Sequence, residues 1–437
     1  MTETAHTIGM SWADRVWLEM SSSVILGPLE LPDLDALRAA FVRLAGLGAQ
    51  TRMGYSISDD RAHWRYDPAS LVALATEAVI EIPAPQIAVD APEAEVLAVA
   101  NRLMEQAQQL RGPAAVRVVR AGNFVIYDQN HAIGDARPLL DNLSALIRVA
   151  DGGSIPEWAS QEVADNPLWL AVTNTFGPGR QRLAPLLRGR LARSEATPGA
   201  PLVNCPPRES DLGAYVTVMS VDSWGQIKQW RRDRNVDASM ASIFLVLARR
   251  ALAAVGVPLT RETTVLYDCR RHLPAGSHVR GNFVVGFVQR LPDDPVSAGQ
   301  QIARTAGSGR ALLTLASATM KHQTVRGPAA GPVNPVCAQS TMAYVFGPRH
   351  SGLERLPWLR PELRCAAARS TTSDLAGLTL TVMLLGGRLS VSWSYHRNVI
   401  DEQLLRAATD LMETDPIALL ERSAEVIGEE TELGGRH

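Results

Sequence analysis

Hydrophobic and polar positions follow two periods along this chain, one typical of helices and one typical of strands. Apolar residues recur every three or four positions, which predicts helices at residues 12–20, 34–44, 92–110, 139–147, 224–231, 240–255, 296–315 and 402–412. Short apolar or alternating runs predict strands at residues 22–26, 52–57, 63–66, 115–119, 123–127, 215–219, 264–267, 342–346, 378–384 and 389–393. The elements are mixed without a regular βαβ rhythm, so the predicted fold class is α+β.

The length of the chain and a local change in composition predict two lobes. A chain of 437 residues is long for a single hydrophobic core. Proline, glycine, arginine and serine become frequent between residues 152 and 210, which is typical of a connection. We therefore expect an N-terminal lobe at residues 1–170, an inter-lobe connection at 171–210 and a C-terminal lobe at 211–437.

Charge and cysteine content narrow the possible partners. The formal net charge is -2, from 43 basic and 45 acidic residues, so we expect no nucleic-acid partner. The four cysteines form no CxxC pair, and we expect neither a disulfide framework nor a metal site. The most apolar segment, residues 241–257, is interrupted by Arg249 and Arg250 and is too short to span a bilayer. No signal peptide is recognisable at residues 1–12, so we expect a cytoplasmic protein.

The candidate chemistry lies in a polar turn between a predicted strand and a predicted helix. The apolar residues 124–127 lead into this turn, which contains His131, and Asp135 follows four positions later. A histidine held near the core can accept a proton at physiological pH, and Asp135 is placed to cap the helix. Taken alone, a histidine after a strand and an aspartate that caps a helix are common, and they favour an ordinary structural pair.

The turn resembles the HHxxxDG motif of the chloramphenicol acetyltransferase-like superfamily, which includes the condensation domains of nonribosomal peptide synthetases and several acyltransferases. His131 and Asp135 match the second histidine and the aspartate of that motif. Asn130 replaces the first histidine and Ala136 replaces the final glycine. Because the second histidine is the catalytic one in this superfamily, the resemblance assigns the chemistry to His131.

The resemblance extends into the second half of the chain. Residues 268–271 (Asp-Cys-Arg-Arg) and 281–283 (Gly-Asn-Phe) are similar to the second-lobe signature of these acyltransferases. The resemblance implies two lobes arranged as a V with a tunnel between them. It also implies an acyl donor that is a thioester of coenzyme A or of a phosphopantetheinyl carrier protein, a small-molecule acceptor, and no permanently bound cofactor. His131 would be the general base on the acceptor.

Further roles follow from the same resemblance. Asp135 would pair with an arginine of the second lobe and support the histidine turn, with Arg270 the first choice and Arg271 the second. The oxyanion donor and the tunnel lining are left open, with ordinary turn and strand chemistry as the alternative for every candidate. These candidates are Asn130, Asn282, Ser340, Thr341 and Tyr395.

The sequence therefore predicts an acyltransferase that forms an ester or an amide, in bacterial specialised metabolism. Two alternatives remain open. The protein could be a condensation-like module that recruits a synthase protein and has no catalytic activity. The changes from the motif at Asn130 and Ala136 favour this alternative. The same tunnel could also perform a reaction without transfer, such as a cyclisation.

Overall fold

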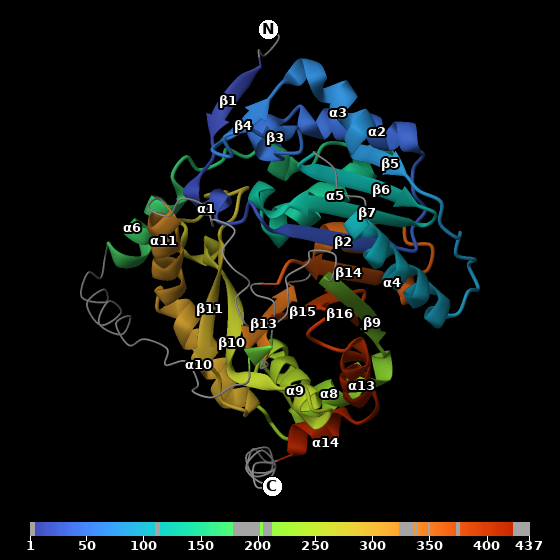
Figure 1. Ribbon diagram of the computed structural model, residues 1–437, viewed down its shortest axis with the longest axis vertical. Helices are drawn as coiled ribbons and strands as arrows, with labels where there is room; N and C mark the ends of the chain where they lie inside the picture. The colour runs from blue at the N-terminus through green and yellow to red at the C-terminus, as the bar shows by residue number, and fades with distance from the viewer. Residues whose placement is uncertain are drawn as a thin grey trace.

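Two lobes stacked one above the other form the protein in the computed structural model (Figure 1). The structure describes residues 5–109, 114–177, 202–203, 212–322, 336–337, 340–347, 350–372 and 376–422. Each lobe contains one large sheet with helices packed against it, which confirms the predicted α+β class.

The first lobe is built on a five-stranded sheet with the order β14-β2-β7-β6-β5. Helices α2 and α5 pack on one face of this sheet, and α4 covers the other face (Figure 1). Because both faces are buried, the central strands are apolar without alternation. The elements of this lobe are β1 (His6–Gly9), α1 (Trp12–Arg15), β2 (Ser21–Gly27), α2 (Leu34–Ala45), β3 (Tyr55–Ile57), β4 (His63–Tyr66), α3 (Leu71–Ala78), β5 (Val79–Glu81), α4 (Glu93–Gln109), β6 (Val116–Ala121), β7 (Phe124–Asn130), the 3-10 turn η3 (His131–Ile133), α5 (Ala136–Ala150) and η4 (Glu157–Ser160).

The second lobe is built on a six-stranded sheet with the order β11-β10-β13-β15-β16-β9. Helices α8, α9, α13 and α14 pack together beside it and enclose its core (Figure 1). The elements of the second half are α6 (Pro167–Phe176), β8 (Leu202–Val203), β9 (Leu212–Met219), α8 (Val221–Asp233), α9 (Met240–Ala254), β10 (Leu259–Asp268), η7 (Cys269–His272), β11 (Val284–Arg290), α10 (Pro295–Gly307), α11 (Arg310–His322), β12 (Val336–Cys337), β13 (Ser340–Gly347), α12 (Ser351–Glu354), β14 (Cys365–Ser370), β15 (Leu378–Leu385), β16 (Arg388–His396), α13 (Glu402–Thr414) and α14 (Pro416–Glu421).

Strand β14 belongs to the first lobe's sheet although it comes from the second half of the chain. It pairs antiparallel with β2 and lies against β16 of the other lobe. Ser390, Ser392 and Ser394 on β16 each accept one backbone N–H from β14, at 3.2, 3.1 and 3.2 Å. The expected C-terminal lobe at residues 211–437 therefore differs from the structure, because β14 from this range is part of the sheet of the first lobe.

Two predicted helices differ from the structure. Residues 296–315 form two helices, α10 and α11, because the chain turns at Gly309 with a left-handed φ of +77°. Phe176 of α6 lies so close to this glycine that a Cβ there would be 2.6 Å from its ring. At residues 12–20 only the four residues of α1 are helical, and turns follow them.

Several elements were not predicted from the pattern, among them α3, α6 and β14. Helix α6 begins before the expected inter-lobe connection at 171–210 and packs against η7 and α11 of the second lobe. Residues 178–201 and 204–211 of that connection lie outside the described residues.

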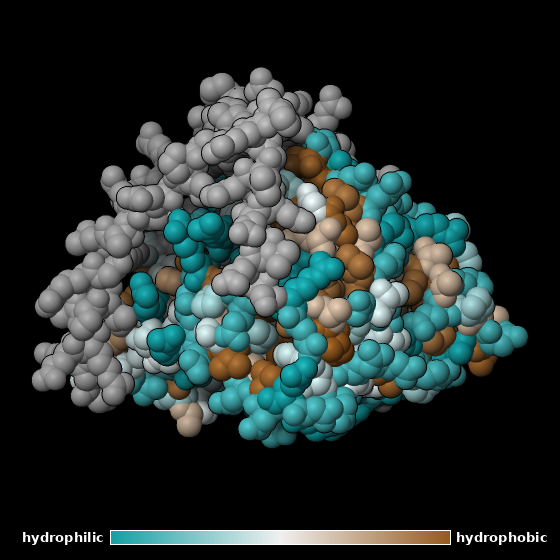
Figure 2. Space-filling model, turned by 90° about the horizontal axis from the view of Figure 1, so that it is seen from below, coloured by the Kyte–Doolittle hydropathy of each residue, from teal (hydrophilic) through white to brown (hydrophobic). Residues whose placement is uncertain are grey.

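The surface of the protein is of mixed polarity. Hydrophilic residues dominate the face seen in Figure 2, and hydrophobic residues gather in narrow bands between them. No helix within the described ranges is long and apolar enough to cross a membrane.

Candidate active site

Strand β7 leads directly into the histidine turn, which lies at the boundary between the lobes. Its last residue, Asn130, uses both ends of its amide on the backbone, accepting from Ala132 N at 2.9 Å and donating to Leu18 O at 2.8 Å. The backbone N–H of His131 donates to Met20 O at 2.8 Å. Asn130 therefore supports the turn through both its amide oxygen and its amide nitrogen. Ala136, which replaces the final glycine of the motif, is exposed at the start of α5, where its methyl group has room.

His131 lies in a buried position. Its side chain is only 8% exposed, and the indole of Trp17 stacks on the imidazole with ring centroids 4.3 Å apart. Burial lowers the pKa of His131 below its usual 6.5 because the cation loses its hydration. The charges of Asp135 and Asp14 and the hydrogen bond to Asn282 offset only part of this effect. His131 is therefore neutral at physiological pH.

The amide of Asn282 determines which imidazole nitrogen carries the proton. Its Nδ2 faces only acceptors, the carbonyl oxygen of His131 at 2.8 Å and the carboxylate oxygen Oδ1 of Asp14 at 3.2 Å. The amide must therefore present Oδ1 to the ring, and this oxygen lies 3.0 Å from His131 Nδ1. An amide oxygen can only accept, so Nδ1 carries the hydrogen and Nε2 keeps its lone pair. Among the described residues, no protein group forms a hydrogen bond with Nε2.

A buried ion pair lies behind this amide. Asp14 is 2% exposed, and its Oδ1 also accepts the backbone N–H of Asn282 at 3.2 Å. Its Oδ2 accepts from Arg52 Nη1 at 2.9 Å and from Ser11 Oγ at 2.7 Å. Carboxylate, amide and imidazole thus form one chain of hydrogen bonds across the lobes, in which each bond polarises the next. Sequence reasoning missed Asp14, Arg52 and Trp17, because no local signal marks residues so far from the motif.

Asp135 joins the two lobes below the histidine turn. Its Oδ1 caps α5, and its Oδ2 lies 2.9 Å from Arg270 Nη2 and accepts the backbone N–H of Phe283 at 2.9 Å. Arg270 also pairs with Asp268 at 3.2 Å, and the arginine side chain is only 10% exposed. The predicted ion pair with the first-choice arginine is present, whereas Arg271 is exposed and does not contact Asp135.

Comparison with known proteins supports the same fold. No family model and no curated protein sequence matches this chain. The condensation domain of Monacolin K polyketide synthase MokA matches with a TM-score of 0.58 and 11% identity, covering 96% of this chain and 97% of that chain. A starter condensation domain of rhizomide synthetase in complex with C8-CoA matches with 0.55 and 12%, covering 96% and 98%. The trichothecene 15-O-acetyltransferase of Fusarium sporotrichioides matches with 0.52 and 11%, covering 93% and 94%.

The chain has the condensation-domain fold. Within this fold, Ser340 and Thr341 lie away from His131. Strand β13 runs parallel to β10, with Ser340 beside Leu259 at the start of both strands. Arg270, which binds the histidine turn, follows the other end of β10 at Asp268, nine residues and about 30 Å further at about 3.3 Å per residue. The register of β13 and β10 therefore does not bring either hydroxyl to the end of the sheet where the histidine turn is bound.

Tyr395 is also absent from the site. Its ring is fully buried in the core of the second lobe, on the face of β16 that packs against α13, and its hydroxyl donates to Glu402. Burial and the neighbouring Glu402 raise the pKa of Tyr395 above its usual range. This condensation-domain fold therefore uses Tyr395 to attach a helix, and the prediction that it lines the tunnel is wrong.

The arrangement around His131 suits proton transfer. A neutral imidazole is held between the lobes by a stacked indole on one side and an oriented amide on the other. Its free lone pair on Nε2 is the group that a general base needs. The structure's described ranges contain no cluster of three histidine, cysteine, aspartate or glutamate side chains that could hold a metal ion.

Proposed function

We propose that this protein is an acyltransferase that moves an acyl group from a thioester to the hydroxyl or amine of a small-molecule acceptor. The observation that carries the proposal is the hydrogen bond between Asn282 Oδ1 and His131 Nδ1, which reserves Nε2 as a base. The pKa of His131 lies below 6.5 through burial, so the base is unprotonated at neutral pH. The fold adds support, since solved proteins that share it include condensation domains and an acetyltransferase.

The reaction requires one proton to move from the acceptor to His131 and from His131 to the leaving thiolate. Nε2 of His131 takes the proton of the acceptor O–H or N–H while the oxygen or nitrogen attacks the thioester carbonyl. The tetrahedral intermediate collapses, the C–S bond breaks, and the leaving thiolate takes the proton from Nε2. The products are an ester or amide and a free thiol, and His131 returns to its neutral form. General-base assistance of this kind is worth about 10²–10⁴-fold in rate.

The cation formed in this step is stabilised by its surroundings. The carboxylates of Asp135 and Asp14 both favour the positive charge of protonated His131. Asp135 has the further role of holding the turn, because its ion pair with Arg270 attaches the loop to the second lobe. We assign Asp135 and Arg270 as positioning residues, and His131 as the single catalytic residue.

The donor is a thioester of coenzyme A or of a carrier protein. One solved structure with this fold is described in complex with C8-CoA, which makes an acyl-CoA the first donor to test. The acceptor side is open to alcohols and amines, since a base at Nε2 serves both.

Incubation with acyl-CoA or acyl-carrier protein and a panel of alcohols and amines, read by mass spectrometry, tests the proposal. We expect transfer by the native protein and a loss of about 10²–10⁴-fold in His131→Ala. His63→Ala is the matched control, because His63 is a partly exposed histidine on β4 that pairs with Asp60. Transfer that survives His131→Ala would refute general-base catalysis. No transfer with any donor, together with tight binding to a synthase protein, would instead support a recruitment module.

A further inference from the structure

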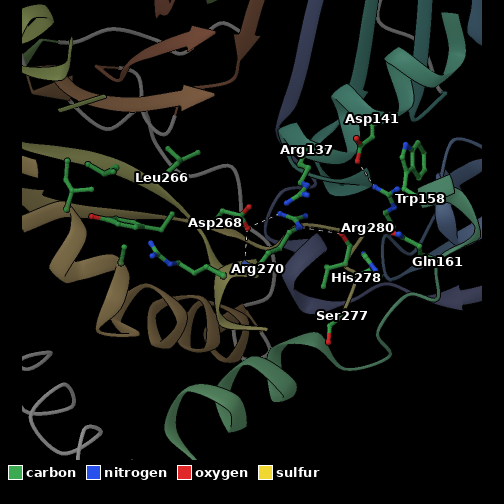
Figure 3. Close-up of a pocket in the computed structure, with 16 residues that line it drawn as sticks. Arg137, Asp141, Trp158, Gln161, Leu266, Asp268, Arg270, Ser277, His278 and Arg280 are labelled. Atoms are coloured by element: carbon green, nitrogen blue, oxygen red, sulfur yellow. Dashed lines mark hydrogen bonds and ion pairs between the residues drawn. The ribbon is translucent and has the colours of Figure 1, made fainter. Parts of the chain in front are cut away.

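A polar cavity lies beside the histidine turn, and Arg270 contributes to both. The cavity has a volume of about 890 Å³, enough for a ligand of cofactor size. The start of α5 and the η4 region of the first lobe form one wall, and the end of β10, η7 and α10 form the other (Figure 3). His131 is not part of the lining. Arg270 faces the cavity and binds Asp135 of the histidine turn.

The wall of this cavity carries more positive than negative charge. Its arginines are Arg137, Arg270, Arg271 and Arg280. Arg270 and Arg280 have carboxylate partners, Asp135 and Asp268 for the first and Asp141 for the second. Arg137 and Arg271 form no ion pair with any described residue. Two guanidinium groups are therefore available to a ligand.

Arg280 adds a buried donor that the protein does not satisfy. The residue is only 8% exposed, and its guanidinium stacks on Trp158 at 3.7 Å from the ring centre. Its Nη1 donates to Asp141 at 2.7 Å, but its buried Nη2 has no hydrogen-bond partner among the described residues. Burial lowers the pKa of Arg280, and the charges of Arg137 and Arg270 lower it further. Like charges crowd this wall, and an anion placed between them would relieve their repulsion.

We propose that this cavity binds the phosphate groups of coenzyme A, so that the acyl donor of the proposed reaction is an acyl-CoA. The inference rests on the proposed function. Arginine is the side chain best suited to phosphate oxygens, which it binds through paired N–H groups. The diphosphate and the 3′-phosphate of coenzyme A carry several negative charges, whereas the phosphodiester of a carrier-bound arm carries one. The two free arginines and the unsatisfied Nη2 of Arg280 match the ligand of higher charge.

Calorimetric titration of the native full-length protein with free coenzyme A tests this proposal without any turnover. Pantetheine, which has the same thiol arm and no phosphate, is the matched ligand. We expect coenzyme A to bind at least tenfold more tightly than pantetheine, and its affinity to fall as salt is raised. 3′-Dephospho-CoA should lie between the two.

Two variants test the residues. Arg137→Gln and Arg271→Gln each remove an exposed guanidinium that makes no ion pair within the described structure, so both should fold normally. Each should weaken coenzyme A binding about tenfold, the value expected for one charged hydrogen bond, and leave pantetheine binding unchanged. Arg261→Gln is the control, because Arg261 is exposed on β10, whose other end lines the cavity, and does not itself line the cavity.

The outcomes separate this inference from the proposed function. Equal binding of coenzyme A and pantetheine, or an equal effect of all three arginine variants, overturns the inference. Transfer from an acyl-carrier protein but not from acyl-CoA overturns it too, while the proposed acyltransferase activity stands. Arginine-dependent binding of coenzyme A without transfer to any acceptor supports the phosphate site and counts against the proposed function.

Discussion

Replacing Asn282 by leucine removes the amide that orients His131 while keeping the size of the side chain. In the native protein Oδ1 accepts the hydrogen of Nδ1 at 3.0 Å, and Nδ2 donates to His131 O and Asp14. Without the amide, the ring is free to carry its hydrogen on Nε2 instead. That tautomer has no lone pair at the position where the acceptor must lose its proton.

The size of the effect follows from one hydrogen bond. A neutral hydrogen bond contributes about 0.5–1.5 kcal/mol, which corresponds to about 0.4–1.1 pKa units. Because the amide oxygen favours the protonated ring, its removal lowers the pKa of His131 further. We expect kcat/KM to fall about 10- to 100-fold, less than the whole general-base contribution of about 10²–10⁴. The buried His131 carbonyl and Asp14 also lose a donor, which costs about 1–3 kcal/mol of stability.

The assay is the dependence of kcat/KM on pH between 5 and 8, with acyl transfer followed by thiol release. The native protein should show a rise with pH whose midpoint lies below 6.5, since burial lowers the pKa of His131. In Asn282→Leu the midpoint should move to lower pH, and the plateau should be lower.

Asn142→Leu controls for the loss of a buried amide. Asn142 is 1% exposed and donates to Thr51 O at 2.9 Å, away from the imidazole. It should lose stability and keep the native pH profile. An unchanged midpoint and plateau in Asn282→Leu would show that the amide does not set the tautomer. The same change of kcat/KM in both variants would show that the loss of any buried amide causes it, through a general loss of packing.

Three further predictions concern stability. Asp135→Asn leaves the buried Arg270 with one carboxylate, so the free energy of unfolding by denaturant should fall by up to about 3 kcal/mol, with a retained circular dichroism spectrum and slower transfer; unchanged transfer would contradict the positioning role. Gly281→Ala places a Cβ 2.7 to 2.9 Å from the ion pair behind the site and should cost about 1–3 kcal/mol, whereas Gly225→Ala, with open space on α8, should raise the melting temperature. The lowered pKa of His131 means that the unfolded chain binds more protons below pH 6.5, so stability should fall with decreasing pH by up to about 1.4 kcal/mol per unit. His131→Ala should reduce that slope, and an unaltered slope would disprove this origin.

Local pattern was sufficient for much of the fold. Strand β7, the capped start of α5 and the turn between them were predicted because apolar period, capping and turn chemistry act over a few residues. His131 and Asp135 were found in the same way, from one short motif. The partner Arg270 came from the resemblance to acyltransferases, since no local pattern pairs residues on different lobes.

Long-range pairing was decided only by the tertiary structure. The alternation of serine with larger apolar residues on β16 predicts a strand, but not that the serines face β14 inside the protein. Ser340 was a candidate by its position in the sequence, and the parallel register of β13 and β10 places it beside Leu259, at the end of β10 away from Arg270. Asn282 approaches His131 from 151 residues away. The period of apolar side chains encodes which face of an element is buried. The order and register of the strands decide which distant residues come into contact, and the histidine site is formed by such contacts between the two lobes.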